Sequence, residues 1–318
     1  MTHASRTFAL AALLLAGCTT SAPPQHARPP IPAPATPAAA PLAAIELAEE
    51  HVVPGRTTGV LKCAGENVRF DLLHDATATA PRPLVLLVPI LAGGKDLMES
   101  IAERMLDRGF DVAFCARVGA ALCAPQRTRD LDDLFRRTVL HQRILLAWLR
   151  RQPTAPSAIC VLGVSMGGIV STVVAALEPD LAGVAICLSG GDLARMVTVS
   201  SERRVENWVT FRHREDGVGD DHLHWELQQG LTHEPLAFAA AIPTEKVLFV
   251  GARFDSVVPP RHQNLLWEAL GRPLRLDVPL GHYSSALAIG GILDACAAHF
   301  ERRLSMRRAT SPLAASAP

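Results

Sequence analysis

A sharp turn is encoded by Gly163-Val164-Ser165-Met166-Gly167-Gly168. It follows directly on a short apolar run, 158–162, and leads into a segment with helical spacing, 167–177. Short apolar runs without alternation are typical of strands buried on both faces of a parallel sheet. Glycines two positions before and after Ser165 allow a turn so tight that the serine takes a strained backbone conformation. The sequence here therefore predicts a strand, a tight turn and a helix, with the serine hydroxyl raised above the sheet.

Similar apolar runs recur along the chain, separated by segments with helical periodicity. The predicted strands are 68–73, 84–88, 111–115, 184–188, 247–250 and 274–278. The further predicted helices are 96–108, 131–150 and 260–270. This alternation predicts an α/β fold with a doubly wound, mostly parallel sheet. In such sheets ligands bind beyond the carboxyl ends of the strands, so we expect the chemistry just after each strand.

Ser165 is a candidate nucleophile, because the turn exposes its hydroxyl at the positive end of a helix. A serine hydroxyl is a poor nucleophile at neutral pH unless a base takes its proton. His282, in Gly281-His282-Tyr283, follows the last predicted strand and can reach back over the sheet toward Ser165. The chain has 12 histidines, so this position, and not the residue type, makes His282 the candidate base.

An acid that orients the histidine is expected after another strand. Asp255 lies in the loop that follows the strand 247–250 and is our first choice. Asp192, after the strand 184–188, is an alternative, and Asp277, inside the last strand, is a weaker one. A plain helix-capping role for Asp255 is the competing interpretation.

Together these residues resemble the α/β-hydrolase superfamily over residues 60–304. Ser165 lies in a Gly-x-Ser-x-Gly turn, Asp255 in an Asp-x-Val-Val-Pro loop and His282 in a Gly-His loop. The order Ser, Asp, His along the chain is that of the superfamily. Within it the chain is most similar to small single-domain esterases and dienelactone-hydrolase-like members. The resemblance implies a serine hydrolase that cleaves small-molecule carboxylic esters through an acyl-enzyme, without a metal or organic cofactor.

Other functions use the same residues. Thioesterases, acyltransferases and peptidases carry the same triad, and a fold does not choose among them. A noncatalytic hydrolase-fold lipoprotein that binds an envelope partner is an alternative of another class. An Asp nucleophile would indicate dehalogenase chemistry, which Ser165 excludes.

An oxyanion hole is the fourth part that the resemblance implies. One donor should be the backbone N–H of Met166, directly after the nucleophile. The second should come from the loop after the strand 84–88, where many relatives have His-Gly and this chain has Pro-Ile-Leu-Ala-Gly-Gly. Because the donor is a backbone group, we choose the N–H of Leu91, with Ile90 as the alternative.

Residues 192–243 carry no strong strand pattern and are rich in charge and histidine. In the superfamily an insertion at this point usually forms a cap that shapes the substrate pocket. A solvated helical excursion is the simpler alternative. The Asp and His residues within 221–224 lack the spacing of a metal site, so we expect no metal. Arg203 and Arg204 are candidates for binding an anionic group and equally for facing water.

The first residues are typical of an export signal. After Arg6, residues 8–16 form an apolar run too short to span a bilayer as a mature helix. The run ends at Leu-Ala-Gly-Cys18, which resembles the lipobox of bacterial lipoproteins, whose cysteine is lipidated and becomes the mature N-terminus. A cleavable signal with a chance cysteine is the alternative. Thr19 stands where Asp would favour inner-membrane retention, so we expect a lipid anchor in the outer membrane of the cell envelope.

These patterns divide the chain into four parts. They are a lipoprotein signal peptide 1–17, a Pro/Ala-rich tether 18–43, a hydrolase domain 44–305 with the cap at 192–243, and a disordered tail 306–318. Proline favours extended polyproline II, so the tether should be semi-rigid and hold the domain off a membrane.

Composition excludes several classes of protein. Hydrophobic residues make up 49% and charged residues 19%, which is too apolar for a disordered chain. Lys+Arg and Asp+Glu both number 31, so a neutral chain gives no electrostatic reason to expect nucleic acid as a partner.

The cysteines allow disulfides in an exported compartment. Cys115 and Cys123 are the best pair by proximity, although spacing does not fix connectivity. Cys160 and Cys187 lie inside apolar runs and are predicted to be buried thiols.

Overall fold

The computed structural model describes residues 42, 44–91, 95–119, 122–123 and 125–310. The predicted signal peptide, Cys18, all of the tether except residue 42, and residues 311–318 lie outside the described residues. Within the described ranges, no helix combines the length and apolar character needed to cross a membrane.

The described residues form a nine-stranded sheet in the order β1-β2-β3-β5-β4-β6-β7-β8-β9. The strands are β1 Glu46–Val53, β2 Arg56–Cys63, β3 Glu66–Leu73, β4 Leu84–Val88, β5 Asp111–Cys115, β6 Ile159–Val164, β7 Gly183–Cys187, β8 Val247–Ala252 and β9 Leu274–Val278. Pairing is antiparallel from β1 to β5 and parallel from β5 to β9. The parallel part brings the carboxyl ends of its strands to one edge of the sheet.

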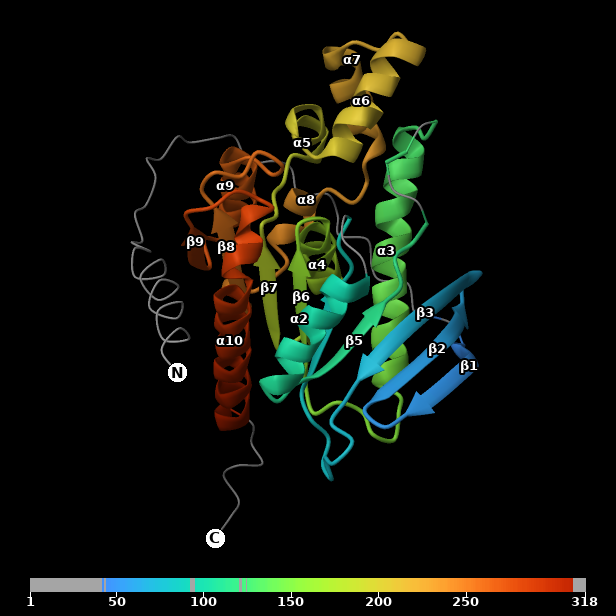
Figure 1. Cartoon of the computed structure of the whole chain (residues 1–318), viewed down its shortest axis with the longest axis vertical. Helices are drawn as coiled ribbons and strands as arrows, with labels where there is room; N and C mark the ends of the chain where they lie inside the picture. The colour runs from blue at the N-terminus through green and yellow to red at the C-terminus, as the bar shows by residue number, and fades with distance from the viewer. Residues whose placement is uncertain (1–41, 43, 92–94, 120–121, 124, 311–318) are drawn as a thin grey trace, which may run out of the picture.

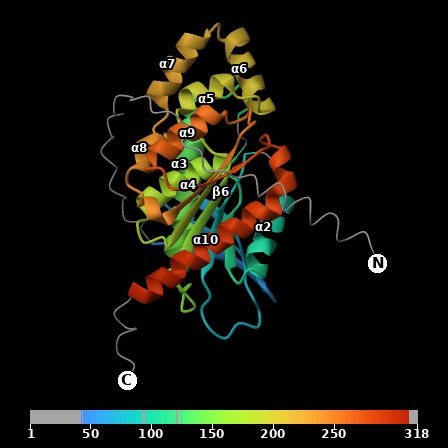
Figure 2. The same ribbon diagram turned by 90° about the vertical axis from the view of Figure 1, so that its left-hand side faces the viewer.

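Helices cover both faces of this sheet (Figure 1, Figure 2). One face packs against α2 Lys95–Asp107 and α10 Ile289–Thr310, and the other against α3 Thr128–Leu149, α4 Met166–Leu177 and α9 Pro260–Ala269. Each face has its own apolar core, and successive strand residues alternate between them: Val161 belongs to one and Leu162 to the other. Because both faces are buried, the strands read as continuous apolar runs.

The predicted doubly wound, mostly parallel sheet is confirmed. The runs 84–88, 111–115 and 274–278 are β4, β5 and β9. The β1–β2 pair was not predicted, because β1 is an exposed edge strand with many polar residues and no continuous apolar run. The predicted start of the disordered tail at residue 306 is corrected, since α10 continues to Thr310. Arg307 and Arg308 lie in its last turn, where positive charge favours the negative end of a helix.

Four helices occupy residues 192–243: α5 Leu193–Val199, α6 Arg203–Glu215, α7 Asp220–Gly230 and α8 Pro235–Ala239. Figure 1 shows α5, α6 and α7 beyond the carboxyl ends of β6 and β7. The solvated alternative is wrong for Arg212, which is only 3% exposed. Its guanidinium donates to Asp216 at 2.5 Å and Glu226 at 2.6 Å, so its charge is paired inside the insertion.

The cysteines differ from one expectation. A Cys115–Cys123 disulfide is wrong, because both thiols are free. Cys115 is buried, with its Sγ 3.5 Å from the carbonyl oxygen of His141, whereas Cys123 lies at the surface. Cys160 and Cys187 are buried thiols, as predicted, and the Sγ atoms of Cys187 and Cys296 lie 3.8 Å apart.

An ion pair joins the antiparallel strands to α3. Glu66 in β3 accepts hydrogen bonds from Nε and Nη2 of Arg137 at 2.9 and 2.8 Å, and lies 3.1 Å from Nε2 of His141. Hydrogen bonding from Arg137, the main cause, lowers the pKa of Glu66 from 4.5 to about 2. The folded protein therefore favours the ionised carboxylate.

We predict that Glu66→Gln lowers the free energy of unfolding by about 1–2 kcal/mol near pH 7, because Arg137 loses its charged partner. The folded pKa lies below the unfolded one. The carboxylate's contribution is therefore complete above pH 4.5 and is lost as the pH falls toward about 2. Urea unfolding near pH 7 and near pH 3 measures this.

Asp133→Asn is the matched control, since it breaks an exposed pair with Arg136 on α3. It should change stability by less than about 0.5 kcal/mol. A Glu66→Gln cost that is the same at both pH values would contradict the assignment.

Candidate active site

Ser165 lies between the end of β6 and the start of α4, with φ 57° and ψ −122°. A positive φ is unfavourable for a residue with a Cβ atom and persists only where the surroundings enforce it. The N–H of Ser165 donates to the carbonyl of Cys187 at 2.8 Å, and the serine carbonyl accepts from Gly168 at 2.9 Å. The backbone is thus held on both sides of the turn, and the side chain is left at the sheet edge.

Glycine is required at two positions of this turn. A Cβ atom on Gly163 would collide with the carbonyl group of Gly167. A Cβ atom on Gly167 would lie 2.6 Å from the carbonyl oxygen of Val88 in β4. The Gly-x-Ser-x-Gly spacing therefore follows from the close approach of α4 to the strands.

The structure brings Ser165, His282 and Asp255 together in one chain of hydrogen bonds. His282 lies in the loop after β9, and its Nε2 is 2.9 Å from Oγ of Ser165. The other ring nitrogen, Nδ1, is 2.8 Å from Oδ2 of Asp255, which follows β8. Three strand ends thus supply a hydroxyl, an imidazole and a carboxylate in the geometry of a nucleophile, its base and an orienting acid.

Asp255 is held on all sides. Its side chain is fully buried, and Oδ1 accepts from the backbone N–H groups of Val257 and Val258 at 2.9 and 2.8 Å. Oδ2 is shared between His282 and the amide of Gln263, whose Nε2 lies 3.3 Å away. Because every lone pair direction has a donor, the carboxylate is fixed toward His282.

The two alternative acids lie elsewhere. Asp192 caps α5 in the left-handed region, and its carboxylate lies 3.9 Å from Arg195. Asp277 accepts from Arg275 at 2.8 Å within β9. Of the three candidates, Asp255 is therefore the one that the structure places in hydrogen-bond contact with His282.

The predicted oxyanion donors lie beside Ser165. Met166 is the first residue of α4, and N–H groups in the first turn of a helix have no acceptor within that helix. Leu91 follows β4 and lines the same cavity as Ser165, as does its alternative, Ile90. The carbonyl of Leu91 accepts a hydrogen bond from Nη1 of Arg117 at 2.6 Å.

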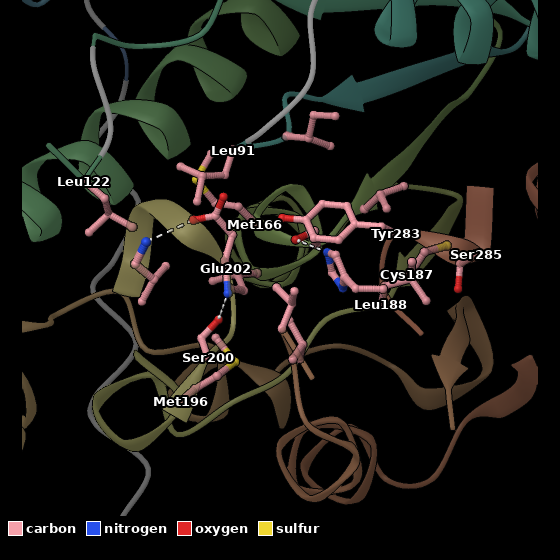
Figure 3. Close-up of a pocket in the computed structure, with 18 of the residues that line it drawn as sticks. Leu91, Leu122, Met166, Cys187, Leu188, Met196, Ser200, Glu202, Tyr283 and Ser285 are labelled. Atoms are coloured by element: carbon pink, nitrogen blue, oxygen red, sulfur yellow. Dashed lines mark hydrogen bonds between the residues drawn. The ribbon is translucent and has the colours of Figure 1, made fainter. Parts of the chain in front are cut away.

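A cavity of about 220 Å³ extends from Ser165 (Figure 3). Its walls come from both apolar cores of the molecule. One side is built from α3, α4, α5 and the start of α6, and the other from α2 and α10. The lining is mostly aliphatic, including Leu134, Met196, Ile101 and Ile292. Such a cavity suits an apolar ligand whose reacting group lies against Ser165.

Two residues at the site were not predicted from the sequence. Gln263, on α9, is completely buried and donates to Asp255 and, at 2.7 Å, to the carbonyl of Val258. A polar residue inside a helix packed on the apolar core was the available signal. Glu202 lines the cavity, and it gave no signal because it stood among many charged residues of the insertion.

Comparison with known proteins agrees with this architecture. Residues 70–205 match the Dienelactone hydrolase family, a segment that runs from β3 into α6 and contains Ser165 but neither Asp255 nor His282. No curated protein sequence matches the chain.

Several solved structures share the fold. Acetyl xylan esterase 1 from Thermoanaerobacterium sp. JW/SL YS485 is 19% identical with a TM-score of 0.56, over 79% of this chain and 87% of that one. Est1E from Butyrivibrio proteoclasticus is 11% identical with a TM-score of 0.57, over 78% and 99%. The 2,6-dihydroxy-pseudo-oxynicotine hydrolase is 17% identical with a TM-score of 0.60, over 79% and 68%. With the family match and the site geometry, these likenesses identify the chain as a hydrolase of the α/β-hydrolase fold.

Proposed function

We propose that the protein is a serine hydrolase that cleaves carboxylic esters of small molecules through an acyl-enzyme. The observation that carries the proposal is the chain of hydrogen bonds from Oγ of Ser165 through His282 to Asp255, at 2.9 and 2.8 Å. Ser165 and His282 line a mostly apolar cavity, where an ester carbonyl can approach the serine.

In the first step, Oγ of Ser165 attacks the ester carbonyl and its proton passes to Nε2 of His282. The imidazolium then gives this proton to the departing alkoxide, which leaves as an alcohol. Asp255 holds Nδ1 of His282 in the protonated tautomer and stabilises the positive charge that forms on the ring. The serine is now esterified by the acyl group.

Water completes the cycle. His282 takes a proton from a water molecule, the hydroxide attacks the acyl-enzyme, and the proton returns to Ser165 as the carboxylic acid leaves. The N–H groups of Met166 and Leu91 are the proposed donors to the oxyanion of both tetrahedral intermediates. All the groups in this scheme belong to the chain or the substrate.

A noncatalytic binding role is less well supported. It gives no reason for Ser165 to keep a strained backbone, or for the carboxylate of Asp255 to be buried with His282 as its one basic partner among the described residues. The arrangement is explained if both features serve a reaction at Ser165.

We also propose that the protein is a lipoprotein of the bacterial envelope, anchored through Cys18. The support is the apolar run that ends in Leu-Ala-Gly-Cys18, together with the Pro-rich segment between that cysteine and the folded domain. The anchor would keep the hydrolase at a membrane surface, with the outer membrane favoured by Thr19.

Ser165→Ala is expected to lower kcat for a short-chain p-nitrophenyl ester by about 10⁴-fold or more, because no other group replaces the nucleophile. A fluorophosphonate probe should label the wild-type peptide that contains Ser165 and fail to label His282→Ala. Mass spectrometry of the labelled peptide reports the site. Full turnover by folded Ser165→Ala would refute the mechanism.

Asp255→Asn should lower kcat by roughly 10²- to 10⁴-fold, because the amide favours the wrong tautomer of His282. Asp192→Asn is the matched control and should change kcat by less than about threefold, since asparagine tolerates the left-handed conformation at that position. Steady-state hydrolysis of one ester by both variants measures the difference. The reverse order would move the acid to Asp192.

Cys18→Ser should abolish incorporation of a radiolabelled or alkyne-bearing fatty acid in bacterial cells, because the thiol is the proposed attachment point. Cys123→Ser, which alters an exposed cysteine of the folded domain, should leave the labelling unchanged. Continued labelling of Cys18→Ser would argue against the anchor.

A further inference from the structure

The cavity beside Ser165 has an unusual charge distribution. Among the described residues that line it, Glu202 is the one carboxylate, and none is a lysine or an arginine. The arginines nearest to Glu202 in sequence, Arg203 and Arg204, are exposed on α6 and do not line the cavity. A mostly apolar cavity thus carries a carboxylate that no lysine or arginine of its wall offsets.

Glu202 is held in place by the start of α6. Its Oε2 accepts from the N–H groups of Arg204 and Val205 at 2.6 and 3.0 Å, and its own N–H donates to Oγ of Ser200 at 3.2 Å. The residue is only 7% exposed. Backbone donors at the positive end of a helix suit a carboxylate, so these contacts fix the side chain in the cavity wall.

Tyr283, next to His282, shows that the negative charge of Glu202 acts on groups near the reacting atoms. Figure 3 shows the hydroxyl of Tyr283 directed toward Glu202. The pKa of Tyr283 is raised, first by partial burial of the hydroxyl and then by the negative charge of Glu202. The electrostatic reach of Glu202 therefore extends to the loop that carries the base.

We propose that Glu202 selects substrates by charge: the enzyme takes neutral esters with apolar acyl and alcohol groups and rejects esters that carry a carboxylate. The inference rests on the proposed ester hydrolysis at Ser165. A second negative charge in this cavity would meet a fixed carboxylate in a medium less polar than water, and most of the lining side chains are aliphatic and have no hydrogen-bond donor.

Two anionic esters test this, because the substrate has two ends. Phenyl adipate monoester carries a carboxylate at the end of the acyl chain and is matched by phenyl hexanoate. 4-Carboxyphenyl hexanoate carries it on the leaving group. One of the two esters places its carboxylate against Glu202. For that ester, Glu202→Gln should raise the ratio of its kcat/KM to that of phenyl hexanoate by about ten- to a hundredfold over the wild-type ratio. The chemical reactivity of each ester is the same for variant and wild type, so it cancels when their ratios are compared.

Glu202→Ser provides a second variant, because serine caps a helix well but carries no charge. It should shift the same ratio in the same direction. Tyr283→Phe keeps the carboxylate, so the enzyme should still reject the anionic ester. Glu234→Gln removes another capping carboxylate, a half-buried one at the start of α8 and outside the cavity, and should leave the ratio at the wild-type value.

The outcomes separate the two proposals. Unchanged ratios for both anionic esters in folded Glu202→Gln and Glu202→Ser would overturn the charge selection, while ester hydrolysis at Ser165 would stand. If wild-type protein does not hydrolyse phenyl hexanoate and takes no fluorophosphonate label, the proposed function fails first. A wild-type enzyme that prefers both anionic esters over phenyl hexanoate would also overturn the inference.

Discussion

The backbone conformation of Ser165 is the constraint on which the rest of the site depends. Its positive φ turns the chain from β6 into α4 without a loop, and this raises the hydroxyl above the edge of the sheet. Gly163 and Gly167 are needed because α4 then lies against β4 and β6. The strain is held by hydrogen bonds to Cys187 and from Gly168, so the unfavourable conformation is stabilised by the strands around it.

The parallel sheet brings the side chains of the site together. The ends of β6, β8 and β9 meet at one edge, and each supplies one member of the hydrogen-bonded chain. Asp255 contributes most to its rigidity, since two backbone N–H groups and Gln263 fix its carboxylate from behind. The strand ends place the three side chains near one another, and buried hydrogen bonds fix the orientation of each side chain.

Much of this could be predicted from the sequence, for a physical reason. Strands buried on both faces appear in the sequence as continuous apolar runs, so the run 158–162 predicts a strand. A turn that excludes Cβ atoms requires glycines, so Gly163–Gly167 predicts the turn at Ser165. Gln263 and Glu202 were not predicted as site residues, because their roles depend on which groups their side chains contact. Residue type and spacing do not show those contacts. The Cys115–Cys123 pair was misjudged for the same reason: proximity in sequence does not tell which way a side chain points.

The buried guanidinium of Arg212 also constrains how the enzyme can turn over. It bridges α6 and α7 through Asp216 and Glu226 and reaches Thr128 at the start of α3 at 3.3 Å. Lifting these helices away from α3 would disturb this paired charge, and breaking its pairing would cost several kcal/mol. Substrate and product should therefore enter and leave without movement of α6 and α7. A step of the chemistry, and not a hinge motion, should then set the maximal rate.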